Sequence, residues 1–248
     1  MSSAEILVEK VAAMELSDGD DPYRGNVHGE SEKNTVWRHG APPSYTLVNI
    51  LFERTRTKVW PKGSLEETVQ NLAKTWEMEL SHKTRIQDFK TIDPNNFSLS
   101  VNGRPALSGK ETLELGSYNA LMQTSLPEEF QYYKTSKETF ESSHEIFRTA
   151  FPGGFAWEVR EVYTGPPVVN FKFRHWGVME GPFKGHAPTG QTVQFTGIAI
   201  AKVDEKLRMK EEEIYYDPAE LCGGLFRGPF DQSYGEYKTG IEGCPFLS

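Results

Sequence analysis

His175 is the residue of this sequence best suited to acid–base chemistry. It follows Val169, Phe171 and Phe173 at every second position, and a strand places alternate side chains on one face. An imidazole that packs against phenylalanines loses hydration, which favours its neutral form and suits a general base near neutral pH. The alternative is a core histidine bonded to a backbone group, and the sequence leaves both roles open.

Asp217 is the second candidate, and it stands directly before Pro218 at the end of the last predicted strand. An aspartate in this position could form a turn, because Asp-Pro pairs are common in turns. It could instead face the mouth of a cavity and carry protons to and from a substrate. The pattern favours the turn slightly and excludes neither role.

A further set of side chains could contact a bound organic molecule. These candidates are Trp76, Glu79, Tyr118, Phe171, Phe173 and Tyr215. Trp and Tyr combine a large apolar surface with one hydrogen-bonding group, so each also fits an ordinary half-buried position. Glu79 lies at the edge of an apolar helical stripe. It is expected to be partly solvated, or paired with an arginine such as Arg174.

The elements that must position these residues begin with helices. Ser64 and Glu67 form a capping-box pattern at the start of the clearest helix. Its apolar stripe consists of Leu65, Val69, Leu72, Trp76 and Leu80. Further helices are predicted from Ser44 to about residue 60, over 110–123 and over 142–150.

From residue 155 the apolar period changes to two, which is typical of strands. Strands are predicted over 155–163, 169–175, 192–203 and 207–216, and tight turns between some of them favour an antiparallel meander. Helices first and strands last indicate an α+β fold. Helices laid across a strongly curved sheet leave an apolar hollow that suits a small organic molecule.

The chain is expected to carry one domain over residues 41–222. An N-terminal extension (1–40) precedes it and a Gly-rich C-terminal tail (223–248) follows it. Within the extension, Ile6, Leu7, Val11 and Met14 could line one face of a short helix. The tail has no apolar period and is expected to wrap the surface or to be partly disordered.

Composition narrows the classes of partner and cofactor. The 248 residues carry a formal charge of −8 without a Lys/Arg block, which argues against nucleic acid. No apolar run reaches the roughly 20 residues of a membrane helix, and acidic residues in the first apolar run argue against a secretory signal. Two cysteines make neither a disulfide framework nor a zinc site, so a cytoplasmic location without a metal is expected. The Gly181–Gly190 loop lacks the final Gly-Lys-Ser/Thr of a P-loop, and no cofactor is predicted.

Three segments of the sequence resemble one known family. They are Glu32–Pro43 (EKNTVWRHGAPP), Thr75–Lys83 (TWEMELSHK) and Phe171–Gly190 (FKFRHWGVMEGPFKGHAPTG). They resemble the plant pathogen-related protein group, a branch of the SnoaL-like, NTF2-like superfamily, and the similarity extends over about residues 23–221. The resemblance implies a cone-shaped α+β fold, in which three or four helices cover a curved antiparallel sheet around a hydrophobic pocket. It also implies that Asp217 matches the acid/base aspartate of polyketide cyclases, and that a homodimer could form through the outer face of the sheet.

Two functions from different classes follow from these features. The first is a non-catalytic facilitator in plant specialised or defence metabolism. It would bind a hydrophobic intermediate (terpenoid, polyketide or phenylpropanoid) or dock on a metabolic enzyme. The alternative is a cofactor-independent cyclase or isomerase in which His175 and Asp217 act as base and acid. The sequence slightly favours the facilitator, because it indicates a pocket more clearly than a reaction.

Overall fold

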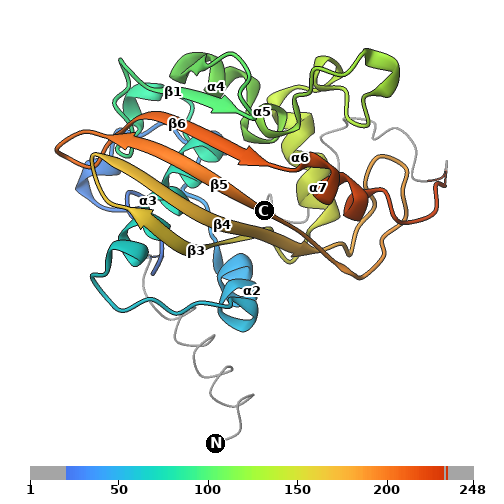
Figure 1. The fold of residues 1–248 in the computed structure, drawn as a ribbon, viewed down its shortest axis with the longest axis horizontal. Helices are drawn as coiled ribbons and strands as arrows, with labels where there is room; N and C mark the ends of the chain where they lie inside the picture. The colour runs from blue at the N-terminus through green and yellow to red at the C-terminus, as the bar shows by residue number, and fades with distance from the viewer. Residues whose placement is uncertain (1–20, 232, 234–248) are drawn as a thin grey trace, which may run out of the picture.

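The computed structural model describes residues 21–231 and 233, which form a helical layer against one curved sheet (Figure 1). The helices are α2 (Thr46–Thr55), α3 (Leu65–His82), α4 (Gly109–Leu115), α5 (Ser117–Met122), α6 (Phe140–Ala150) and α7 (Pro218–Leu225). The strands are β1 (Ser98–Val101), β2 (Leu107–Ser108), β3 (Ala156–Thr164), β4 (Val168–Val178), β5 (Thr192–Val203) and β6 (Met209–Tyr216). The predicted α+β class is confirmed, but the order of helices first and strands last is only approximate, because β1 and β2 precede α4 and α7 follows β6.

The sheet has the strand order β2-β1-β6-β5-β4-β3. Strands β3 to β6 form the antiparallel meander that the sequence predicts, and β1 extends it by pairing in parallel with β6. Register shifts interrupt the pairing of β3 with β4 and of β5 with β6. Such bulges bend strands, so they contribute to the curvature of the sheet.

Strand β4 shows how the pleat sorts side chains between the faces. Val169, Phe171, Phe173 and His175 are buried on the inner face, whereas Lys172 between them is exposed. The strict alternation follows from the period of two in a strand. The sequence pattern therefore places His175 on the face that the helices cover.

Helix α3 covers this inner face. Its N-cap Ser64 accepts a hydrogen bond from the backbone N–H of Glu67, as predicted. The Glu67 carboxylate accepts from the N–H of Gly63 instead of Ser64, so the capping box is only half formed. The side chain of Gln70 accepts from the N–H of Val159 at 3.1 Å and ties the helix to β3.

The single helix expected over 110–123 is wrong. Gly116 separates α4 from α5 and has a φ of 86°, a conformation that interrupts a right-handed helix and favours glycine. A Cβ atom at this position would lie 2.9 Å from the ring of Phe140. The break thus lets α6 approach closely at this point.

Near both predicted domain boundaries, described residues of the extension and of the tail contact the helices or belong to one. Residues 21–40 lie against the helices, where Asn49 of α2 donates to Asp21 and accepts from Arg24, each at 2.8 Å. At the other end, α7 runs into the segment that the sequence assigns to the tail. The predicted helical face at Ile6–Met14 and most of the tail lie outside the described residues.

A fully buried ion cluster fixes the end of α3. The Lys83 ammonium lies 3.0 Å from Glu79 and 2.7 Å from Glu32, and the side chains of Lys83 and Glu79 are both 0% exposed. Glu79 also accepts the backbone N–H groups of Lys90 and Thr91. These bonds satisfy the buried carboxylate and tie the segment before α2 and the segment after α3 to one helix.

The predicted solvation of Glu79 and its predicted pairing with Arg174 are both wrong. Arg174 points to the other face of β4, where it lies 3.3 Å from Glu158, its partner in register on β3. Glu79 instead faces the loop that follows α3. Its role in the structure is to hold that loop.

Replacing the cation of this cluster should destabilise the fold. In Lys83→Met, Glu79 and Glu32 lose their shared cation, and an unpaired buried charge costs about 3–5 kcal/mol. Urea denaturation should show a loss of this size in the free energy of unfolding. The exposed Lys172→Met is the matched control, and a loss in Lys83→Met as small as in the control would contradict the assignment.

Candidate functional site

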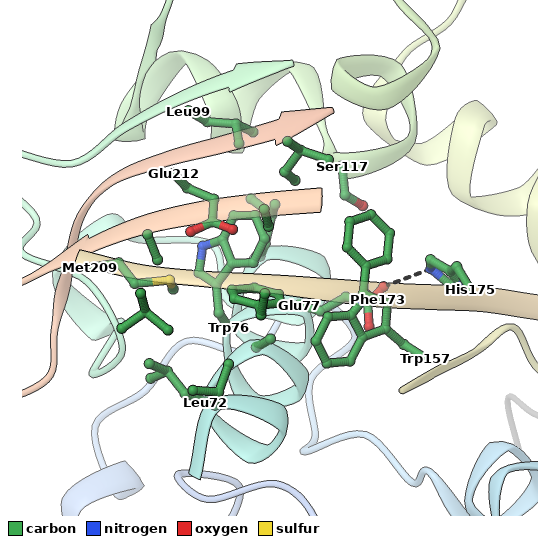
Figure 2. A pocket seen from close by; sticks show the side chains of 18 of the residues that line it. Leu72, Trp76, Glu77, Leu99, Ser117, Trp157, Phe173, His175, Met209 and Glu212 are labelled. Carbon is green, nitrogen blue, oxygen red and sulfur yellow. Dashed lines mark hydrogen bonds and ion pairs between the residues drawn. The ribbon is translucent and has the colours of Figure 1, made fainter. Parts of the chain in front are cut away.

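A cavity opens between α3 and the inner face of the sheet (Figure 2). The cavity has a volume of about 90 Å³. One water molecule needs only about 10–15 Å³, so the cavity has room for a small organic molecule. Its walls come from α3, α5 and five of the strands.

The walls of the cavity are mostly apolar. Val69, Leu72, Trp76 and Leu80 of the predicted α3 stripe line one side. Phe171 and Phe173, both expected to contact a ligand, line the other side together with Trp157 and Phe195. Rings in this wall contact one another edge-on, as between Phe173 and Phe195 at 6.0 Å. Such a lining favours apolar ligands and raises the cost of any charge inside.

One polar group of the cavity is the pair formed by Glu77 and His175. The Nε2 atom of His175 lies 3.2 Å from Oε1 of Glu77, and Nδ1 lies 2.9 Å from the carbonyl oxygen of Ala156. Glu77 projects from α3, and 35% of its side-chain surface is accessible. Both residues line the cavity, and Figure 2 shows His175 well apart from Glu212.

The protonation of this pair follows from its partners. A carbonyl oxygen only accepts, so Nδ1 of His175 carries a proton. Burial raises the pKa of the Glu77 carboxyl, but the hydrogen bond and charge of His175, with Arg24 and Lys74, hold that pKa below its ordinary value. Glu77 is therefore ionised, and its carboxylate accepts a hydrogen bond from Nε2 of His175. The bond to a backbone group that one of the two alternatives for His175 predicts is present, and the same residue lines the cavity.

The second polar group of the cavity is formed by Glu212 and Trp76. Glu212 projects from β6 and is 4% exposed, and burial raises the pKa of its carboxyl to about 8, with the charge of Glu213 adding to the shift. Oε2 of Glu212 and Nε1 of Trp76 are buried without a hydrogen-bond partner among residues 21–231 and 233. Figure 2 shows both side chains directed into the cavity.

The structure places four of the sequence candidates away from this cavity, one of which is Glu79 in the buried ion cluster at the end of α3. Asp217 is exposed and caps α7, since its carboxylate accepts the N–H of Ala219 at 2.9 Å. Tyr215 is 40% exposed on the outer face of the sheet and donates to Glu213. Tyr118 stacks on Phe147 with ring centroids 4.1 Å apart. Of the two roles predicted for Asp217, the local one in a turn agrees with this helix-capping position, and the one at the mouth of the cavity does not.

Sequence reasoning missed two carboxyls that the fold brings to the cavity. Glu77 lies one residue after Trp76 and shares its helix face with Ala73 and Leu80, a spacing of i, i+4 and i+7 that could have been read. Glu212 alternates with the cavity-lining Ile214 on β6. The run of glutamates from 211 to 213 hides that alternation, because such a run reads as a solvated face.

Over residues 21–231 and 233, no group of three or more His, Cys, Asp or Glu side chains is arranged to hold a metal ion. The same part of the chain contains no helix long and apolar enough to cross a membrane.

The protonation of Glu212 predicts a pH dependence of stability. The folded state keeps the proton up to about pH 8, whereas an unfolded glutamate releases it near pH 4.5, so the folded state binds more protons between these values. The free energy of unfolding should fall by about 1.4 kcal/mol for each pH unit in this range, relative to Glu212→Gln.

Thermal or urea unfolding of both proteins between pH 5 and 8.5 measures this difference. Glu205→Gln, in an exposed turn, is the control and should follow the wild type at every pH. A constant difference between Glu212→Gln and the wild type would show that Glu212 is ionised throughout.

Comparison with known proteins identifies the family. No protein-family profile matches the sequence. Two solved structures show low similarity. A candidate SnoaL-like polyketide cyclase from Jannaschia sp. CCS1 has 15% identity and a TM-score of 0.38 over 69% of this chain and 100% of that one. A candidate polyketide cyclase from Acidithiobacillus ferrooxidans has 12% identity and a TM-score of 0.40 over 68% of this chain and 100% of that one.

A "Pathogen-related protein" from Hordeum vulgare is 47% identical over 231 residues, which are 92% of this chain and 96% of that protein. With this identity over nearly the whole of both proteins, the chain belongs to the pathogen-related protein family.

Proposed function

We propose that the protein binds a predominantly apolar small molecule in the cavity between α3 and the sheet, and acts as a facilitator without catalysing a reaction itself. The observation that carries this proposal is the cavity, whose aromatic and aliphatic walls favour an apolar ligand. Terpenoid, polyketide and phenylpropanoid intermediates have this character. The name of the Hordeum vulgare relative supports a role of such a ligand in plant defence.

The arrangement of the predicted acid and base favours binding over catalysis. Asp217 caps a helix at the surface and is not available to a ligand in the cavity. His175 uses both ring nitrogens, one for the Ala156 carbonyl and one for Glu77. A general base needs a free lone pair within reach of the substrate proton, and this imidazole offers none in its bonded state.

A specific observation supports one alternative, an isomerase or cyclase that uses Glu77. Its ionised carboxylate faces the cavity, and His175 would hold it in place and take part of its charge. A carboxylate in an apolar site can remove a proton next to a ketone. This alternative replaces the predicted His175–Asp217 pair with a Glu77–His175 pair.

Deuterium exchange separates the two functions. The protein is incubated with 2-tetralone in D₂O, and loss of the α-proton signals is followed by NMR. A facilitator leaves the exchange at the buffer rate. Exchange accelerated at ordinary enzyme rates, and abolished in Glu77→Gln, would establish the alternative and contradict the proposal.

Filling the cavity should block binding. Ala199 lies on its β5 wall, and Ala199→Leu places three further carbon atoms in the space a ligand would occupy. Titration with the neutral fluorescent probe N-phenyl-1-naphthylamine should show affinity at least about tenfold weaker than in the wild type, a difference of about 1.4 kcal/mol.

Thr196→Leu is the matched control, because it adds bulk to the exposed face of the same strand. It should bind the probe as the wild type does. If the probe binds equally well to Ala199→Leu, the ligand site lies elsewhere on the molecule.

Three further expectations accompany this function as proposals. The facilitator would act in the cytoplasm, it would dock on a metabolic enzyme that makes or uses the ligand, and it would form a homodimer through the outer face of the sheet. Exposed apolar side chains on that face, such as Val168, Ile198 and Tyr215, support an interface there.

A further inference from the structure

The Glu212 end of the cavity contains two polar atoms that form no hydrogen bond with the described residues. Oε2 of Glu212 and Nε1 of Trp76 are buried and unpaired among the described residues, and both side chains line the cavity. Most buried polar atoms of native proteins have a partner, and an unpaired one is costly. Two such atoms in one ligand-sized cavity point to a ligand group that pairs with them.

The surroundings of Glu212 are apolar. In register it lies between Leu99 of β1 and Ala201 of β5, and the cavity wall continues with Met209 and Ile214. No ion pair of Glu212 is found within residues 21–231 and 233. Burial raises the pKa of this carboxyl to about 8, which keeps it a neutral acid at pH 7 with one O–H donor.

The two groups together select among ligand charges. The indole N–H of Trp76 only donates, so a ligand ammonium group, which has no acceptor, would leave it unpaired. An anionic ligand group would enter a cavity whose described lining contains no Lys or Arg side chain and already includes the ionised carboxylate of Glu77. A ketone or hydroxyl oxygen carries no charge and can accept from both donors.

We propose that Glu212 and Trp76 form a polar subsite that binds one uncharged oxygen, a ketone or a hydroxyl, of an otherwise apolar ligand. This inference rests on the proposed function, because it requires the ligand to lie in the cavity. It names the chemical class of that ligand: a neutral, mostly apolar compound that carries an oxygen at the end directed toward β6.

Four probes of similar size test the subsite. They are naphthalene, 2-tetralone, 2-naphthoate and 2-naphthylmethylamine, which share a bicyclic skeleton and differ in their polar group. Isothermal titration of the full-length protein at pH 7 should give an affinity for 2-tetralone about tenfold higher than for naphthalene. The anion and the cation should both bind more weakly than 2-tetralone.

Variants connect this preference to the two residues. Trp76→Phe keeps an aromatic ring without the N–H, and Glu212→Leu keeps the bulk without the carboxyl. Each should lower the affinity for 2-tetralone about tenfold and leave that for naphthalene nearly unchanged. Glu212→Gln retains an N–H donor and should keep most of the preference, and thermal unfolding confirms that each variant is folded.

The possible outcomes separate the subsite from the cavity. If naphthalene binds and 2-tetralone binds no better, the subsite is wrong while the proposed function stands. Tightest binding of the amine or the carboxylate would overturn the choice of a neutral oxygen. If no probe binds and N-phenyl-1-naphthylamine also fails, the proposed function is wrong and the subsite with it.

Discussion

The ion cluster of Lys83, Glu79 and Glu32 is the interaction on which the rest of the structure depends. It is buried at the end of α3, and it joins the segment before α2 and the loop after α3 to this helix. A buried ion pair gains little by itself, because the desolvation of its charges offsets their attraction. The cluster nevertheless requires one position of α3, since any displacement of this helix would leave a buried charge unpaired. The cluster therefore holds the helix that forms one wall of the cavity.

The cavity contains two carboxyls in opposite protonation states. Glu77 is ionised because His175 and nearby cations favour its charge, whereas Glu212 is neutral because its apolar surroundings disfavour charge. The same helix and sheet thus create one charged and one neutral polar group within a single hollow. Environments that push apart the pKa values of two such groups are typical of functional sites, since they separate an acceptor from a donor.

Much of the fold could be predicted from the sequence, because period-two and helical spacing report which faces are buried. The strands around His175 and the cap at Ser64 follow from such local patterns. The break at Gly116 could not be predicted in this way, since it depends on the close approach of Phe140 from a helix later in the chain. The candidate site was harder to predict. Phe171, Phe173, Trp76 and His175 line the cavity, but Glu79 and Glu77 are only two positions apart on α3, and only the rotation of the helix decides which one faces the ligand space.

Glu212 gives the strongest reason to regard the cavity as functional. A leucine at this position would match the surrounding Leu99, Met209 and Ile214 and would remove the cost of burying a carboxyl. Oε2 of Glu212 has no hydrogen-bond partner within the described residues that could offset this cost. Even as a neutral acid, the buried carboxyl loses part of its hydration. Residues that lower the stability of the fold and have no compensating contact within the protein are characteristic of sites where a ligand supplies that contact. The buried, unpaired oxygen of Glu212 and the unpaired N–H of Trp76 are therefore the features of the cavity that most favour the proposed binding of a neutral ligand oxygen.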